Sequence, residues 1–231
     1  MRIPNLRPLT DPKLFWQRVV LYSKRLSPRL RWQEAAGFEA VWPAARERTV
    51  VDEAAAHMLF QLARHAIKLE GAFAEVGVYR GGTAKLLAGI ADRAGRELHL
   101  FDTFAGMPET DQARDLHTAG DFADTSLEGV QRFLSGHTSP TFHQGYFPGT
   151  AKGLEDRKFA LVHVDADIAS SVGACCELFY PRLVPGGVMI FDDYGQTSCP
   201  GAKSATDAFF ADKAEPVLHL VTSQALVIKL P

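Results

Sequence analysis

The segment FALVHVDADIASS, residues 159–171, carries the strongest structural signal in the chain. Its first part, Phe159–Val162, is a continuous apolar run, which is typical of a buried strand in a parallel sheet. The run leads to Asp165 and Asp167, two carboxylates two residues apart, and Ser170-Ser171 can then cap a helix. This order indicates an α/β sheet with a ligand site at the carboxyl ends of its strands.

A second apolar run, Gly187–Phe191, also ends in two carboxylates, Asp192 and Asp193. Because the carboxyl ends of parallel strands meet at one edge, we expect all four aspartates there. Buried carboxylates repel one another and are costly to desolvate unless a cation lies between them. Oxygen ligands select Mg²⁺, Mn²⁺ or Ca²⁺ over zinc, so the sequence predicts a divalent metal site. The alternative is that the two pairs only cap a turn and a helix.

The rest of the chain alternates strand and helix patterns. Predicted strands lie at 72–76, 97–101 and 141–147, and predicted helices follow at 83–91, 127–134, 171–183 and 200–213. Residues 185–187, Pro-Gly-Gly, predict a turn before the run at 187–191. Two final strands, 216–221 and 225–230, are joined by three residues, which is too short for a helical crossover and predicts an antiparallel pair. We therefore expect an α/β fold with a doubly wound, mostly parallel seven-stranded sheet and a C-terminal antiparallel hairpin.

Residues 1–48 precede this pattern and form a predicted N-terminal helical extension to the domain at 49–231. Asp11 and Pro12 suit the start of a helix over 11–26. The extension is rich in Arg and Lys, which is typical of a solvated helix face or of contact with an anionic substrate or partner. Residues 51–70 predict a further helix, with one apolar face.

Size and composition limit the class of protein. The 231 residues suit one α/β domain with a short extension, and the formal charge of −2 gives no case for nucleic acid. Cys175, Cys176 and Cys199 form no CxxC motif, so we expect reduced thiols. Neither a signal peptide nor a membrane-spanning run is visible, and we expect a cytoplasmic protein.

The first predicted core strand leads into a glycine-rich loop, from Glu75 to Gly82. Its Gly-x-x-x-Gly-Gly spacing differs from that of a dinucleotide site, and Glu75 would repel a pyrophosphate. A carboxylate suits an ammonium or sulfonium group instead. Asp102 ends the next strand, where an acid accepts hydrogen bonds from ribose hydroxyls. Together these features predict S-adenosylmethionine, although the glycine loop alone would equally fit a tight turn.

Other polar and aromatic residues have two interpretations each. The aromatic residues beside Gly145 can pack on an adenine ring or belong to the core. We expect His143 and His163 to be polar core groups or supports for ligands. Residues 106–124 are rich in Gly, Asp and Thr, and long irregular segments of this kind often form lids.

The chain contains, in this order, the motifs EVGVYRGGTA, FDTFAGMPE, GYFPGT, HVDAD and YPRLVPGGVMIFDDYG. Together they resemble the macrocin O-methyltransferase (TylF-like) family over about residues 48–213. The resemblance implies a class I methyltransferase fold, S-adenosylmethionine, Mg²⁺, and methylation of sugar hydroxyls in natural products. The family commonly has Leu-Tyr after the second aspartate of the DxD motif, where this chain has Ile168-Ala169.

The resemblance also implies roles for individual residues. It makes Asp165, Asp192 and Asp193 the ligands of Mg²⁺ or Mn²⁺, and Asp167 the general base. In the implied reaction, a metal bound to two neighbouring hydroxyls of a small-molecule acceptor lowers the pKa of one, and Asp167 removes its proton. The residues implied around the cofactor are Thr49, Glu75, Gly77, Tyr79, Gly81, Thr83, Asp102, Thr103, Gly145 and Phe147.

Other functions stay open at this point. A methyltransferase for catechols or other phenolic diols would use the same metal chemistry. An NAD-dependent dehydrogenase is disfavoured by the glycine spacing, and a glycosyltransferase would leave Asp192-Asp193 unexplained. A non-catalytic interaction protein that keeps the fold is the remaining alternative. Whatever the function, we expect the N-terminal helices to line the cavity or to form the interface of a homo-oligomer.

Overall fold

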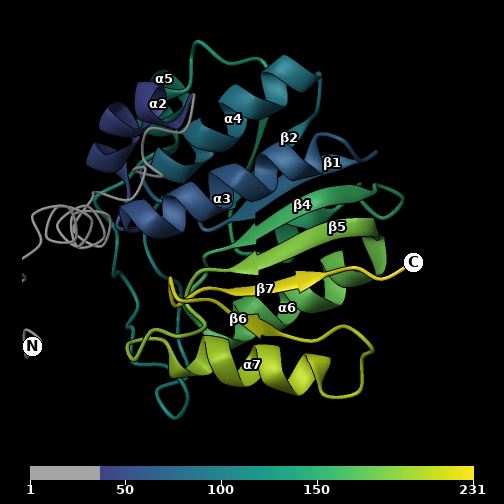
Figure 1. The fold of residues 1–231 in the computed structure, drawn as a ribbon. Coiled ribbons are helices and arrows are strands. Elements are labelled where there is room, and N and C mark those ends of the chain that lie inside the picture. Colours follow the sequence, from purple (N-terminus) through teal and green to yellow (C-terminus); the bar gives the residue numbers. More distant parts are fainter. Residues whose placement is uncertain (1–36) are drawn as a thin grey trace, which may run out of the picture. The chain divides into compact units, whose positions relative to one another are not determined.

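Seven strands form one sheet in the order β3-β2-β1-β4-β5-β7-β6 (Figure 1). The computed structural model describes residues 37–231, so the helix predicted at 11–26 lies outside the described residues. The first five strands are all parallel, and their carboxyl ends meet at one edge, as the sequence predicted. These strands are β1 (Ala72–Val76), β2 (Leu98–Asp102), β3 (Pro140–Gln144), β4 (Phe159–Val164) and β5 (Leu183–Phe191).

The C-terminal hairpin contains the reversed strand of the described sheet. β7 (Ala225–Ile228) is antiparallel both to β5 and to β6 (Leu218–His219), which confirms the expected hairpin. One local prediction was wrong. The turn expected at 185–187 lies inside β5, because the Gly186 N–H donates to the carbonyl of Lys229 at 2.8 Å and so continues the ladder.

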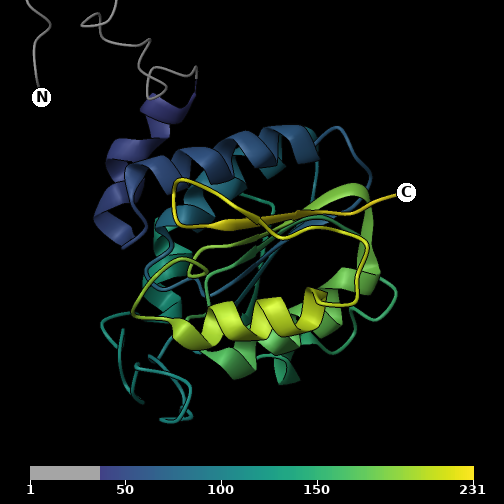
Figure 2. The ribbon, with the colours of Figure 1, turned by 60° about the horizontal axis from the view of Figure 1, so that its bottom comes forward.

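Helices cover both faces of the sheet, which confirms the doubly wound arrangement. Figures 1 and 2 show α2, α3 and α4 on one side and α6 and α7 on the other. The described α-helices are α2 (Phe38–Ala45), α3 (Glu53–Ala66), α4 (Gly82–Ala94), α5 (Leu127–Phe133), α6 (Ala169–Phe179) and α7 (Pro200–Phe210). Three single 3₁₀ turns accompany them: η2 (Arg46–Arg48), η3 (Gly149–Ala151) and η4 (Tyr180–Arg182).

The central strands are buried on both faces, as their continuous apolar runs predicted. Every residue of β1 and of β4 is buried. The helix predicted at 51–70 begins later, at α3, where the side chain of Asp52 accepts a hydrogen bond from the Ala55 N–H at 2.9 Å. This cap fixes the start of α3 beside the carboxyl edge of the sheet.

The described part of the predicted extension packs against the domain. Phe38 of α2 stacks on Trp42 and meets Phe60 of α3 edge-on. A Cβ atom on Gly82 would lie 2.5 Å from the carbonyl oxygen of Ala45 and 2.7 Å from Cβ of Thr49, so the start of α4 needs glycine there. The segment from α2 to Thr49 is therefore built onto α3 and α4.

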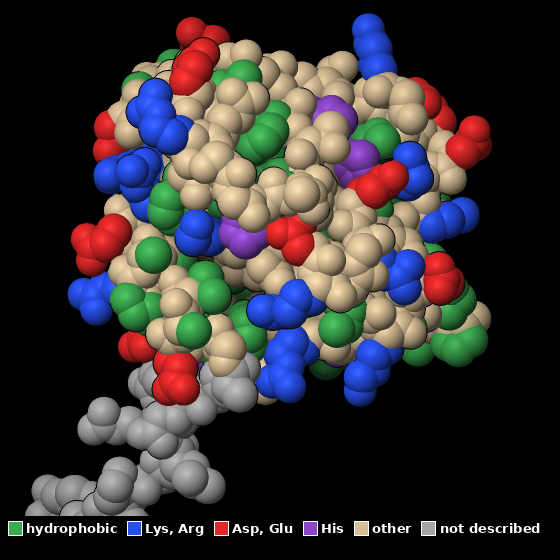
Figure 3. Space-filling model, turned by 90° about the horizontal axis from the view of Figure 1, so that it is seen from above, with side chains coloured by type: hydrophobic (Ala, Val, Ile, Leu, Met, Phe, Trp, Pro, Cys, Tyr) green, Lys and Arg blue, Asp and Glu red, His purple; other side chains and the backbone are tan. Residues whose placement is uncertain are grey.

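The described surface carries both signs of charge. On the face in Figure 3, Lys and Arg side chains are interspersed with Asp and Glu side chains, in keeping with the small net charge. Among residues 37–231, no helix is both long enough and apolar enough to cross a membrane.

Candidate active site

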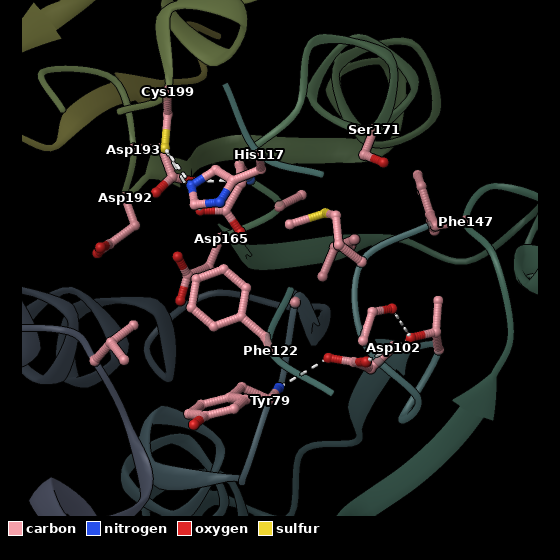
Figure 4. A pocket seen from close by; sticks show the side chains of 18 of the residues that line it. Tyr79, Asp102, His117, Phe122, Phe147, Asp165, Ser171, Asp192, Asp193 and Cys199 are labelled. Atoms are coloured by element: carbon pink, nitrogen blue, oxygen red, sulfur yellow. Dashed lines mark hydrogen bonds and ion pairs between the residues drawn. The ribbon is translucent and has the colours of Figure 1, made fainter. Parts of the chain in front are cut away.

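A cavity of about 370 Å³ opens at the carboxyl edge of the parallel strands (Figure 4). Its walls come from the ends of β1, β2, β4 and β5, from the loop between β2 and α5, and from residues 50–55. In Figure 4, Asp165, Asp192 and Asp193 lie at one end, whereas Asp102 and Phe147 lie at the other. The cavity therefore has an acidic end and an end formed by one carboxylate and an aromatic ring.

The acidic end brings together aspartates from two strand ends. Asp165, Asp192 and Asp193 each offer an oxygen, and these atoms lie within 4.8 Å of one another. Burial, followed by the charges of Asp192 and Asp193, raises the pKa of Asp165 well above its usual value. Burial, followed by the charges of Asp167 and Asp192, does the same to the pKa of Asp193. Both shifts follow first from burial and then from like charges close by.

Two hydrogen bonds orient the carboxylates at the acidic end. Gln224 Nε2 donates to Asp192 Oδ1 at 2.7 Å and to the carbonyl of Ala55 at 3.3 Å, and the Asp167 N–H donates to Asp193 Oδ2 at 2.9 Å. Three converging carboxyl groups offer the oxygen ligands that suit a hard divalent cation, such as Mg²⁺ or Mn²⁺. The predicted metal ligands are therefore close enough to share one ion.

Asp167 lies next to this cluster and faces the cavity. Its φ of 58° is in the left-handed region. Asp167 Oδ1 lies 3.5 Å from Cys199 Sγ and 3.6 Å from His117 Nε2. Burial, partly offset by the hydrogen bond from Cys199, raises the pKa of Asp167 to about 6. Its carboxylate is thus mostly ionised at neutral pH and able to accept a proton.

His117 and Cys199 were not predicted as site residues, although both line the cavity. His117 belongs to the loop between β2 and α5, and its Nδ1 lies 3.1 Å from Asp121 Oδ2. Nearby in this loop, Asp115 Oδ1 accepts a hydrogen bond from the Ala169 N–H at 2.9 Å. Asp115 therefore fastens the loop to the first turn of α6.

That contact also corrects the prediction that Ser170-Ser171 cap a helix. Both serines lie inside α6, whose N-cap residue is Ile168 and makes no side-chain capping bond. The free N–H of Ala169 is satisfied by Asp115, which lies 54 residues earlier in the chain. A distant carboxylate thus replaces the expected local cap.

The opposite end of the cavity is organised by Asp102. Its Oδ2 accepts hydrogen bonds from the N–H groups of Val78 and Tyr79, at 2.7 and 2.8 Å, and its Oδ1 accepts one from Phe104 at 2.7 Å. Gly77 has a φ of +90°, and a Cβ atom there would lie 1.6 Å from the carbonyl oxygen of Asp165. Glycine at this position therefore lets the ends of β1 and β4 approach each other.

Most of the residues expected around the cofactor do line the cavity. They are Gly77, Tyr79, Asp102, Thr103, Gly145 and Phe147. A half-buried carboxylate beside glycine backbone, with an aromatic ring close by, fits the ribose and base of a nucleoside. This end of the cavity therefore suits the nucleoside part of S-adenosylmethionine.

Four expected cofactor residues lie outside the cavity lining: Thr49, Glu75, Gly81 and Thr83. Thr49 lies against Gly82, and its Oγ1 accepts a hydrogen bond from the Val51 N–H at 3.1 Å. Gly81 is the N-cap residue of α4, and Thr83 is buried within its first turn. Thr49 and Gly81 therefore shape the backbone around the start of α4.

Glu75 departs most from the expectation, because its side chain is fully buried and pairs with His163. His163 Nδ1 lies 2.8 Å from Glu75 Oε1, and His163 Nε2 lies 3.6 Å from Asp192 Oδ1. Burial alone would lower the pKa of His163, but these two carboxylates raise it well above its usual value. Glu75 and His163 thus form a buried acid–base pair behind Asp192, which is a predicted metal ligand.

Known proteins resemble this chain in sequence and in fold. The sequence model of the family described as Macrocin-O-methyltransferase (TylF) matches residues 40–219. One relative, from Streptomyces olivaceus, is 30% identical to this chain over 146 residues, which are 57% of this chain and 56% of the relative. It is named "8-demethyl-8-(2,3-dimethoxy-alpha-L-rhamnosyl)-tetracenomycin-C 4'-O-methyltransferase". The Mycinamicin III 3''-O-methyltransferase of Micromonospora griseorubida is 33% identical over 144 residues, 54% of this chain and 56% of its own. This chain thus matches just over half the length of these curated relatives.

Solved structures share the fold over nearly the whole chain. The O-methyltransferase NovP superposes with a TM-score of 0.70 at 25% identity, covering 96% of this chain and 100% of NovP. The calicheamicin methyltransferase CalS11 superposes with a TM-score of 0.67 at 18% identity, covering 99% and 98%, which shows the fold alone. Because the family model covers most of the described residues and the fold agrees, this chain belongs to the macrocin-O-methyltransferase (TylF) family.

Proposed function

We propose that this protein transfers the methyl group of S-adenosylmethionine to a hydroxyl of a sugar or glycosylated natural product, with a divalent metal ion and Asp167 as the base. The observation that carries the proposal is the cavity with two unlike ends. Three converging carboxylates lie at one end, and Asp102 lies at the other. Family membership and the sugar-directed names of the relatives support the choice of acceptor.

The residues at the acidic end would hold the metal and one acceptor hydroxyl. Asp165, Asp192 and Asp193 are the proposed ligands of Mg²⁺ or Mn²⁺. A cation bound there supplies Lewis acidity, which lowers the pKa of a nearby acceptor hydroxyl. Asp167 accepts the proton of that hydroxyl, since its carboxylate faces the cavity beside the ligands.

The residues at the other end would hold the methyl donor. Asp102 would accept hydrogen bonds from the ribose hydroxyls, and Phe147 would lie near the adenine ring. S-adenosylmethionine supplies the electrophilic methyl group. The chain itself contributes alignment. Three backbone N–H groups hold Asp102 in place, and Asp102 would thereby hold S-adenosylmethionine at a fixed position relative to Asp167.

The loop between β2 and α5 would exclude water from the reaction. Gly106, Met107, Pro108, His117 and Phe122 from this loop line the cavity. Asp115 ties the loop to α6, so the segment lies over the cavity. We expect this cover to open for exchange of substrates and to close during the transfer.

The test is a methyl-transfer assay with a labelled donor and a panel of three acceptors. The panel holds a rhamnoside with neighbouring hydroxyls, the same glycoside lacking one of the two, and a catechol. We expect transfer to the first acceptor only, loss of transfer in EDTA, and recovery with Mg²⁺. Transfer to the catechol alone would assign the protein to phenolic diols. Full methyl transfer in excess chelator would show that the reaction needs no metal ion.

A further inference from the structure

Cys199, His117 and Asp167 form a compact cluster beside the cavity. Their ligating atoms come from three separate segments: the loop after β2, the residues after β4, and the residue before α7. Cys199 Sγ lies 3.7 Å from His117 Nε2 and 3.5 Å from Asp167 Oδ1, and His117 Nε2 lies 3.6 Å from Asp167 Oδ1. Figure 4 shows the thiol of Cys199 pointing at the ring of His117.

Cys199 Sγ, His117 Nε2 and Asp167 Oδ1 form a triangle whose size matches one face of a tetrahedral zinc site. With Zn–S of about 2.3 Å and Zn–N and Zn–O of about 2.0 Å, neighbouring ligand atoms in a tetrahedral site lie roughly 3.3 to 3.6 Å apart. The three measured distances in the cluster are within a few tenths of an ångström of these edges. An ion could thus be bound with little movement of the side chains.

The chemistry of the cluster differs from that of the three aspartates. A thiol, an imidazole and one carboxylate suit a borderline-soft cation such as Zn²⁺, whereas three carboxylates suit Mg²⁺. His117 has the orientation usual for a metal ligand, since Asp121 contacts its Nδ1 at 3.1 Å and leaves Nε2 facing the cluster. Asp121 is itself held by the Thr118 N–H at 3.0 Å.

The cluster is also accessible from the cavity. Cys199 is buried, but the side chains of His117 and Asp167 are each 19% exposed, and all three residues line the cavity. An ion entering from the cavity would therefore meet three ligands and keep its fourth position open to solvent or to a ligand.

We propose that Cys199, His117 and Asp167 form a second metal site that binds Zn²⁺ and thereby inhibits the enzyme. Binding displaces the thiol proton of Cys199 to solvent while the sulfur keeps its electron pair. The inhibition rests on the proposed function, because zinc engages the carboxylate of Asp167 that accepts the substrate proton. The bound ion also joins the loop that carries His117 to the rest of the cavity wall.

The binding test uses Co²⁺ as a coloured probe for the full chain, with a non-thiol reductant and without cofactor or acceptor. We expect a thiolate-to-cobalt absorption band in the near ultraviolet, which oxygen ligands alone do not give. The band should disappear in Cys199→Ala and persist in Cys176→Ala, a matched change at a buried cysteine on α6. Absence of the band in the unmodified chain, or its persistence in Cys199→Ala, would overturn the site.

Two loop variants keep the test decisive if Cys199→Ala fails to fold. His117→Gln removes a ligand from the loop and should abolish the band at the same Co²⁺ concentration. Asp121→Asn removes only the partner of His117 Nδ1 and should weaken Co²⁺ binding about 10-fold to 100-fold. Unchanged Co²⁺ affinity in both variants would contradict the assignment of His117 as a ligand.

The inhibition test measures methyl transfer in excess Mg²⁺ with increasing Zn²⁺. Relative to its own zinc-free rate, Cys199→Ser should need about tenfold more Zn²⁺ for half inhibition than Cys176→Ala needs. Equal zinc sensitivity in the two variants would refute inhibition through this site. Because the cobalt band needs no turnover, a chain that binds Co²⁺ without transferring methyl would refute only the proposed function.

Discussion

The backbone N–H of Asp167 donates to the carboxylate of Asp193 at 2.9 Å. A residue just beyond β4 thus orients a residue just beyond β5. This bond holds the proposed base at a fixed place relative to a proposed metal ligand. It also explains how Asp167 can adopt a φ of 58°, since the contact compensates for a backbone conformation that few side chains favour.

Replacing the proposed base should slow the reaction without loosening the site. We expect Asp167→Asn to lower kcat about 10²-fold or more, the usual contribution of a general base. Asn tolerates the left-handed conformation, so the backbone bond to Asp193 is retained. Steady-state methyl transfer measures kcat, and calorimetry with S-adenosylhomocysteine measures cofactor binding. Asp111→Asn, in the loop between β2 and α5, is the matched control, and near-normal kcat in Asp167→Asn would remove Asp167 from its role.

Repulsion between the carboxylates at the acidic end should lower the stability of the metal-free chain. In EDTA, Asp165→Asn should have a higher free energy of unfolding than the unmodified chain, since burial and the charges of Asp192 and Asp193 disfavour the carboxylate of Asp165. Mg²⁺ at about 100 times its Kd should stabilise the unmodified chain by about 2.7 kcal/mol and leave Asp165→Asn unchanged. Urea unfolding in EDTA and in Mg²⁺ provides both values. An equal response to Mg²⁺ in the two proteins would count against Asp165 as a ligand.

Removing one partner of the buried acid–base pair should be costly. Glu75→Gln leaves His163 without its 2.8 Å carboxylate in a fully buried place, so we expect a loss of about 3 kcal/mol in the free energy of unfolding. Glu47→Gln is the same change at an exposed ion pair with Arg46 and should cost less than about 0.5 kcal/mol. Urea unfolding compares the two. A stable Glu75→Gln with weakened cofactor binding would return Glu75 to the role first expected of it.

Asp92 should make stability depend on pH in acid. Burial alone would raise its pKa, but hydrogen bonds from His137 at 2.6 Å and from Ser139 at 2.7 Å outweigh burial and lower it to about 2. A depressed pKa means that the carboxylate stabilises the fold above about pH 4, and that this stabilisation disappears as the pH falls towards 2.

The corresponding measurement compares the unmodified chain with Asp92→Asn by urea unfolding at several pH values. The difference in free energy of unfolding should be larger at pH 6 than at pH 2 by about 2 kcal/mol, which is the pKa shift converted to free energy. A difference that stays constant over this range would show that the carboxylate of Asp92 has the same pKa in the folded and unfolded chain.

The sequence predicted the acidic end of the cavity because that end depends on topology. Asp165 and the pair Asp192-Asp193 each follow an apolar run, and parallel strands end at the same edge of a sheet. The structure confirms that they meet there. The reversed β7 was likewise predictable, because the three-residue join before it is too short for a helical crossover.

The same reasoning did not predict the partner of Glu75, because β1 is buried on both faces. Such a strand has no alternation of polar and apolar residues, so the sequence does not indicate which side of the sheet a given residue faces. Glu75 pairs in register with His163 of β4, and both side chains lie in the interior. The available signal was that each of these apolar strands contains one such polar residue. Aligning the two strands in register would have predicted the contact between Glu75 and His163.

His117 and Cys199 could not be found by strand-end reasoning. His117 lies in an irregular loop whose position depends on the bond between Asp115 and Ala169, 54 residues apart. Cys199 was counted with the other reduced thiols, because no local spacing linked it to a histidine. Contacts set by long-range packing leave no periodic pattern in the sequence.

Gln224 has a consequence for how the protein is made. It holds Asp192 from 32 residues further along the chain and also reaches back to the carbonyl of Ala55 on α3. During translation the strands that carry the aspartates emerge first. The two hydrogen bonds of Gln224 can form only after residue 224 has left the ribosome. The acidic end is therefore among the last parts of the newborn protein to mature.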